Sequence, residues 1–173
     1  MKRKKVYVIT SIDTECDKED KWEIPQPMQF ENIKIQEEVF GALYKKFAIK
    51  PTYLLSPEIL KSDLCVEIFK KMDNIELGTH LHEEFIEPNA NMLANRTKNI
   101  QADLSPQIEK EKLTNLTDLF INKFGYSPKS FRAGRFGYGP KSFELLENLG
   151  YLVDSSVTPF KTNYFNSGVK TNG

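Results

Sequence analysis

The two histidines of this 173-residue chain, His80 and His82, are separated by one residue in the segment "GTHLHEEF". Side chains two positions apart on an extended strand point to the same face, so both imidazoles can reach one ligand. Neutral imidazole is the commonest metal ligand among side chains. The spacing therefore indicates half of a metal site, with the alternative that two polar residues happen to end a short strand.

The segment "SIDTECD" offers two carboxylates with the same spacing, Asp13 and Glu15. Two imidazoles and one carboxylate leave open positions on a divalent cation, as catalytic zinc sites require. Such a cation polarises a carbonyl group and lowers the pKa of bound water towards about 7. A second carboxylate that does not bind the cation can act as the general base on that water.

A glycine-rich segment, "FRAGRFGYG", and the later "DSS" supply the remaining polar candidates, Arg132, Arg135 and Asp154. The glycines favour a tight turn that exposes its backbone. An arginine there can orient a carboxylate base through a bidentate pair, and turn amides near Phe136 can stabilise an oxyanion. Together these residue types support metal-assisted hydrolysis of an amide or ester. Asp154 has a plainer alternative, as a cap for the residues that follow it.

These candidates need a scaffold that brings strand ends together, and the apolar pattern predicts one. We expect five buried strands, at 5–12, 51–55, 75–82, 130–134 and 151–156. We expect helices at 33–47, from Pro57, again from Ser62, and at 105–125 and 140–150. Strands that alternate with helices predict a parallel sheet in an α/β fold, where ligands collect at the carboxyl ends of the strands. The candidates lie at four of these five ends.

The segments outside these elements have weaker patterns. Residues 83–104 are polar and rich in asparagine, and we expect a long loop that contacts substrate. Beyond Thr158 the pattern is that of a loop, so a closed barrel lacks strands here. We expect Trp22 and the apolar helix stripes to pack in the core or against loops. Cys16 has no neighbouring histidine to activate it, which disfavours a nucleophilic role.

Composition limits the class of protein. With 39% hydrophobic residues the chain can bury a core, and its 24 basic and 24 acidic residues give no electrostatic argument for nucleic acid or an anionic membrane. No apolar run is long enough to insert in a membrane or to form the core of a leader peptide. Two cysteines form no disulfide framework. We therefore expect a cytoplasmic protein, with its oligomeric state open.

Four segments in order, "SIDTE", "GTHLH", "FRAGRFGYG" and "VDSSVTP", resemble the motifs of the polysaccharide deacetylase family, also called NodB-homology or carbohydrate esterase family 4. The resemblance implies a distorted (β/α) barrel, of which residues 1–173 would be the N-terminal portion with about five βα units. The implied activity is removal of acetyl groups from an N-acetylated sugar of a polysaccharide or its precursor. The implied cofactor is a divalent metal ion, Zn²⁺ being the expected one.

Carried over residue by residue, the resemblance makes Asp13 the catalytic base, paired with Arg132, and makes Asp154 the support of that arginine. It makes metal ligands of the carboxylate and the two imidazoles, Glu15, His80 and His82. We expect the glycine-rich turn to contact the carbohydrate through Arg135, Phe136 and Tyr138.

The chain departs from the family pattern in three ways. The family has adjacent aspartates in its first motif, where this chain has Asp13-Thr14-Glu15. The family spaces its histidines by four, which would make Glu84 the second ligand in place of His82. The family also has a late histidine that acts as general acid, and no histidine follows His82. We expect truncation, because the late strands and the acid are missing together.

Other functions are compatible with the same residues. A metal-free glycoside hydrolase could use Asp13 and Glu15 as its paired carboxylates, although the histidines would then have no role. A catalytically inactive, carbohydrate-binding homologue would explain the missing acid. Phosphoesterases also use a His-x-His pair, but theirs normally follows the first strand and not the third.

Overall fold

A five-stranded, fully parallel sheet forms the centre of the computed structural model, which describes residues 5–94, 100–160, 162–164 and 170–172. Each strand pairs with the next one along the chain. The strands are β1 (Ser11–Thr14), β2 (Thr52–Leu55), β3 (Glu76–Leu81), β4 (Ser130–Ala133) and β5 (Val153–Asp154). The predicted parallel α/β architecture is thereby confirmed.

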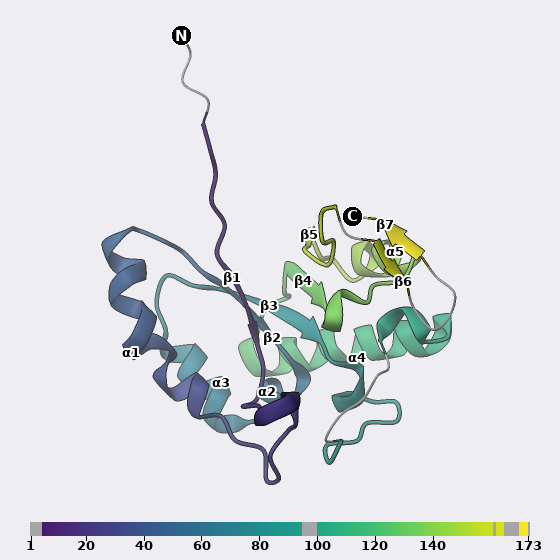
Figure 1. Ribbon diagram of the computed structural model, residues 1–173, viewed down its shortest axis with the longest axis horizontal. Helices are drawn as coiled ribbons and strands as arrows, with labels where there is room; N and C mark the ends of the chain where they lie inside the picture. The colour runs from purple at the N-terminus through teal and green to yellow at the C-terminus, as the bar shows by residue number, and fades with distance from the viewer. Residues whose placement is uncertain (1–4, 95–99, 161, 165–169, 173) are drawn as a thin grey trace.

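Five α-helices connect and cover these strands in the described part of the chain. They are α1 (Glu31–Lys46), α2 (Pro57–Lys61), α3 (Asp63–Lys71), α4 (Pro106–Phe124) and α5 (Ser142–Asn148). In Figure 1, α1 and α3 lie together at one side of the sheet, and α5 lies near β5 on the opposite side. Short 3-10 turns lie in the connections between these elements: η1 (Asp20–Trp22), η2 (Glu83–Phe85), η3 (Gln101–Asp103) and η4 (Gly134–Phe136). Of these, η2 and η4 come soon after the ends of β3 and β4.

The helix boundaries follow local sequence signals. Ser62 and Ser105 accept hydrogen bonds from the amides of Cys65 and Ile108, as N-cap residues do. Gly125 ends α4 with a φ of 81°, a left-handed conformation that favours glycine. Ser56, which precedes Pro57 of α2, does not cap that helix, because its hydroxyl donates to the carbonyl oxygen of Thr14 on β1 instead.

The sheet is strongly curved at the carboxyl-terminal ends of its strands. Three strand spacings separate β1 from β4, which in a flat sheet amounts to about 14 Å. Yet Nη1 of Arg132 on β4 lies 2.5 Å from Oδ1 of Asp13 on β1, closer than the two side chains could reach across a flat sheet. This curvature is compatible with a barrel-like α/β fold. Among the described strands β1 and β5 remain the two edges.

One continuous apolar core fills the space between the sheet and its helices. Tyr53 and Phe131 from the strands are fully buried, as is Phe120 from α4. Tyr53 packs on Phe69 of α3, with 5.2 Å between ring centroids. This packing holds the strands in place, and the polar candidate residues lie at the carboxyl ends of the strands.

The first predicted strand was wrong over most of its length. Only Ser11–Thr14 pair as β1, and the apolar residues 6–9 are 83–88% exposed. The ladder between β1 and β2 begins where the amide of Thr52 donates to the carbonyl oxygen of Thr10, whereas the carbonyl oxygen of Pro51 accepts from Glu76 of β3. Figure 1 shows this segment running away from the body of the protein.

Several expected core residues are also exposed. The stripe on α1 expected to pack in the core is 47–60% exposed; it comprises Ile35, Val39, Leu43 and Phe47. Ile33 anchors this helix instead, with 1% of its surface exposed. Trp22 and Leu64 are 77% and 50% exposed, against the expectation of packing. The period of a helix identifies its apolar side, but the neighbouring elements decide whether that side is covered.

The predicted loops contain more structure than expected. The region 83–104 holds η2 and η3, and its residues 95–99 lie outside the described residues. Beyond Thr158, where a loop was predicted, β6 (Thr162–Tyr164) and β7 (Lys170–Asn172) form an antiparallel pair. Residues 161, 165–169 and 173 lie outside the described part of the chain.

Gly78 in β3 provides a test of the strand packing. A Cβ atom at this position would collide with the carbonyl oxygen of Ser130 on β4 and lie 2.9 Å from Cδ2 of Leu54 on β2. We expect Gly78→Ala to lower the free energy of unfolding by roughly 1–3 kcal/mol, the usual cost of overpacking. Urea denaturation measures this change. Gly139→Ala is the matched control, because its Cβ would meet its nearest neighbour at 3.5 Å. Equal stability of the two variants would contradict the close approach of β3 and β4 at this position.

Candidate metal centre

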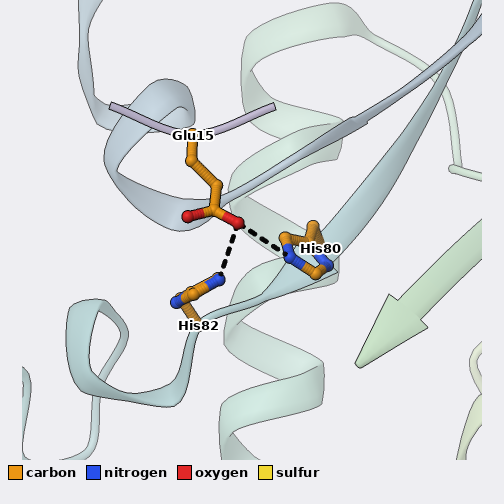
Figure 2. A group of neighbouring side chains, drawn as sticks. All are labelled: Glu15, His80 and His82. Carbon is orange, nitrogen blue, oxygen red and sulfur yellow. Dashed lines mark ion pairs between the residues drawn. The ribbon is translucent and has the colours of Figure 1, made fainter. Parts of the chain in front are cut away.

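Three ligand groups meet at the carboxyl ends of β1 and β3. Glu15 directly follows β1, His80 lies in β3 and His82 follows it. Oε1 of Glu15 lies 3.3 Å from Nε2 of His80 and 3.1 Å from Nε2 of His82. Figure 2 shows both imidazoles turned towards this one oxygen. The ligand atoms lie within 4.8 Å of one another, so small side-chain rotations would bring them onto a single cation.

Each imidazole is held from behind through its other nitrogen. Nδ1 of His80 lies 2.9 Å from the carbonyl oxygen of Arg132, its neighbour in the β3–β4 register. Nδ1 of His82 lies 3.3 Å from Oε1 of Glu84. With Nδ1 protonated towards these acceptors, Nε2 of each ring is left to bind a cation. Glu84 thus lies on the far side of His82 from Glu15, and the structure groups His82, not Glu84, with the other ligand atoms.

The protonation of Glu15 and that of the two histidines depend on one another. Burial alone raises the pKa of Glu15, but hydrogen bonds and positive charge from His80 and His82 outweigh it and hold that pKa well below its usual range. Burial lowers the pKa of His82, but the nearby carboxylates of Glu15 and Glu84 raise it by more, so the net effect is a raised pKa. A cation that binds here must therefore displace a proton from His82.

The donor set fits a divalent cation of the zinc type. His80 and His82 are 2% and 6% exposed, so both ligand nitrogens are withdrawn from water. Nε2 of His82 is buried, and its one close polar neighbour among the described residues is Oε1 of Glu15, at 3.1 Å. Two imidazole nitrogens and one carboxylate oxygen are the ligands of several catalytic zinc sites. A cation would bind this nitrogen and the Glu15 oxygen together.

Asp13 and Arg132, predicted as a pair, are brought into contact. Besides its ion pair with Asp13, the guanidinium donates from Nη2 to Oγ of Ser11, at 2.7 Å. Its Nε donates to the carbonyl oxygen and Oγ of Ser155, at 3.2 and 3.1 Å. The ring of Phe136 lies 5.6 Å from the guanidinium carbon. Arg132 is therefore fixed on every side, and it fixes the Asp13 carboxylate in turn.

Asp154, expected to support Arg132, does so through its neighbours. Its Oδ1 accepts hydrogen bonds from the amide and hydroxyl of Ser156, at 3.0 and 2.5 Å. This turn places Ser155 against Arg132, and Ser155 makes the direct contact. Burial raises the pKa of Asp154, against the positive charge of Arg132, which lowers it. Ser155 was not among the predicted site residues, although it is the first serine of the "DSS" segment.

The three residues predicted to contact substrate have other partners. Arg135 forms an ion pair with Glu84, with Nη2 2.7 Å from Oε1. Phe136 lies against Arg132, as described above. Tyr138 is buried in the main core and packs on Phe143, with 5.4 Å between ring centroids. The amide of Gly137, beside the turn amides expected to meet an oxyanion, donates to the carbonyl oxygen of Gly134.

Two lysines that the sequence analysis did not single out help to build the site. Lys18 pairs with Oε2 of Glu15 at 3.2 Å, which leaves Oε1 for the histidines. Lys112 of α4 is 2% exposed and donates to three carbonyl oxygens of the loop after His82, those of Glu83, Ile86 and Pro88. Nothing in the local sequence distinguishes Lys112 from a surface lysine.

No protein-family model and no curated protein matches this chain. Within the described residues, no helix combines the length and apolar character needed to cross a membrane. The fold and the site define an α/β protein that carries a candidate two-histidine, one-carboxylate metal centre at the carboxyl edge of a curved parallel sheet.

Cys16, next to Glu15, gives a prediction about reactivity. Its side chain is 1% exposed, and burial together with the negative charge of Glu58 raises the pKa of its thiol to about 11. Burial also raises the pKa of Cys65. Because the thiolate is the reactive form, we expect neither cysteine of the folded protein to react with iodoacetamide at pH 7.5.

Mass spectrometry after brief labelling measures this, with both thiols labelled in guanidinium chloride as the control. Rapid labelling of Cys16 in the folded protein would contradict the prediction and restore a nucleophilic role.

Proposed function

We propose that this chain belongs to a metal-dependent hydrolase that removes acetyl groups from an N-acetylated sugar of a polysaccharide or its precursor. One observation carries the proposal: Glu15, His80 and His82 converge on a compact ligand group while the strand that precedes Glu15 also presents Asp13, locked by Arg132. A ligand group beside a separate, oriented carboxylate is the arrangement that metal-assisted amide hydrolysis requires.

Each residue has a definite task in this proposal. Glu15, His80 and His82 would hold a divalent cation, Zn²⁺ by its ligand preference, which when bound supplies Lewis-acid polarisation of a carbonyl group and makes water more acidic. Asp13 would accept the proton of the water that attacks the acetyl carbon. It would then pass this proton to the amide nitrogen, so that the C–N bond breaks and acetate and the free amine leave. Arg132 directs the Asp13 carboxylate through an ion pair whose guanidinium is itself fixed by Ser11 and Ser155.

The choice of substrate has a different basis. Four segments resemble the polysaccharide deacetylase motifs. They lie at the carboxyl-terminal ends of β1, β3, β4 and β5, which face the same way in a parallel sheet. An N-acetylated carbohydrate is the substrate class that this resemblance implies. The curved, parallel sheet agrees with the barrel-like fold of that family, and we propose the NodB type on the same basis.

The metal-free glycoside hydrolase has less support. Such an enzyme keeps one carboxylic acid protonated, with a raised pKa, so that it can donate to the leaving group. The two histidines hold the pKa of Glu15 well below its usual range, which is the opposite requirement. Asp13, the other carboxylate of that alternative, is held in an ion pair with Arg132.

Metal uptake tests the ligand group. We expect the purified chain to bind about one Zn²⁺ and to lose it in the His80→Ala/His82→Ala variant, because the variant removes two of three ligands. Elemental analysis after dialysis measures the content. Cys65→Ser is a control for thiol ligation, since Cys65 is buried in the core and outside the ligand group. A variant that retains full zinc content would contradict the site.

Asp13→Asn tests the general base. We expect zinc content to stay at the parent level while the rate of acetate release from N-acetylated chito-oligosaccharides falls about 10²- to 10⁴-fold. Asp17→Asn is the matched control: Asp17 lies on the same segment, but its carboxylate caps α1 through the amides of Glu31 and Asn32. Asp17→Asn should lose stability and keep its turnover rate. Unchanged acetate release by Asp13→Asn would exclude Asp13 as the base.

A further inference from the structure

We infer that Glu84 and Arg135 are a positioning pair that acts through His82: Arg135 fixes the Glu84 carboxylate, and Glu84 fixes the ring of His82 with Nε2 towards Glu15. The inference deepens the proposed function and rests on its metal centre. It assigns to Arg135 a task inside the protein, where the sequence predicted a contact with substrate.

The contacts form a continuous chain. Oε1 of Glu84 lies 3.3 Å from Nδ1 of His82 and 2.7 Å from Nη2 of Arg135. Oε2 of Glu84 lies 3.4 Å from Nη1 of Arg135, so one guanidinium spans both oxygens of the carboxylate. Glu84 is 6% exposed. A buried carboxylate held in this way has little freedom to turn away from His82.

The backbone is built to keep this arrangement. The 3-10 turn η2 folds Glu84 back towards His82, only two residues earlier, and Lys112 clamps the same turn through the carbonyl of Glu83. Arg135 has a φ of 55°, a left-handed conformation that is costly for a residue with a side chain. A Cβ atom at Gly134 would collide with the carbonyl oxygen of Leu81, which shows how closely η4 approaches the end of β3.

The two histidines are held by unlike acceptors. His80 meets the neutral carbonyl oxygen of Arg132, whereas His82 meets the carboxylate of Glu84. A carboxylate behind an imidazole fixes its tautomer and makes the other nitrogen a stronger ligand than a carbonyl does. His82 also lies outside the hydrogen-bonded part of β3, so its side chain depends more on such a contact than that of His80. Removal of Glu84 should therefore weaken the centre through His82.

Metal affinity tests the inference without requiring catalysis. Zn²⁺ and Co²⁺ dissociation constants are measured by competition with a chromophoric chelator, and the visible spectrum of the Co²⁺ protein reports the ligand field. We expect Glu84→Gln to weaken binding about 10- to 100-fold and to shift the Co²⁺ bands. Arg135→Gln should give a smaller loss. The double variant should bind no more weakly than Glu84→Gln alone, because the inferred effect of Arg135 on the metal passes through Glu84.

Arg135→Lys provides a graded variant, since lysine keeps the charge but not the planar fork, and its affinity should fall between those of the parent and Arg135→Gln. Glu83→Gln is the matched control for lost charge. Glu83 is the preceding residue, is 8% exposed and pairs with Lys112, with no ion pair to either histidine among the described residues. Its affinity should stay within about threefold of the parent, a change of less than one kcal/mol.

Thermal unfolding of the metal-free variants separates positioning from folding. A Glu84→Gln protein that is less stable but binds both metals with parental affinity and an unchanged Co²⁺ spectrum would overturn the inference. Parental zinc binding without acetate release would overturn the proposed function and leave the inference standing. A parent chain that takes up neither metal would overturn both.

Discussion

The guanidinium of Arg132 joins parts of the sheet that the strand order keeps apart. It pairs with Asp13 on β1, reaches Ser11 on the same strand and donates to Ser155 after β5. These contacts are possible only because the sheet curls towards its carboxyl edge. The same curvature carries Glu15, at the end of β1, over β2 to the two histidines at the end of β3. The candidate base and the candidate metal ligands therefore depend on one geometric condition.

The site is a set of buried charges in which opposite signs alternate. Glu15 lies between the two histidines and Lys18, and Glu84 lies between His82 and Arg135. An isolated charge in such a position is strongly destabilising, whereas a paired and hydrogen-bonded one is tolerated. This constraint explains why the turn after β4 adopts costly left-handed conformations at Arg135 and Phe136. The strained backbone brings the side chain of Arg135 to Glu84 and the ring of Phe136 to Arg132.

The proposed deacetylase and the proposed positioning pair draw on different parts of this arrangement. The hydrolytic chemistry needs the ligand group and Asp13, at the ends of β1 and β3. The positioning pair needs the two turns η2 and η4, which follow β3 and β4 and pack closely together. A change in one turn can therefore alter how firmly His82 is held while Asp13 and Arg132 remain in place.

Much of the fold and the set of candidate residues follow from the amino-acid sequence alone. Apolar runs located β2 to β5 and the first two residues of β1, and local chemistry marked Ser62, Ser105 and Gly125 as helix ends, because caps and left-handed glycines act within a few residues. The two-residue spacings placed His80 with His82, and Asp13 with Glu15, on common faces, because side chains alternate along a strand.

Only the tertiary structure decided which of those residues touch. It paired Arg135 with Glu84, buried Tyr138 in the core and left residues 6–9 exposed. It also chose His82 over Glu84 for the ligand group, through the turn that folds Glu84 behind the ring. These outcomes depend on sheet curvature, on the close approach of two turns and on which neighbours cover each face. Such contacts join residues far apart in the chain, and no local pattern encodes them.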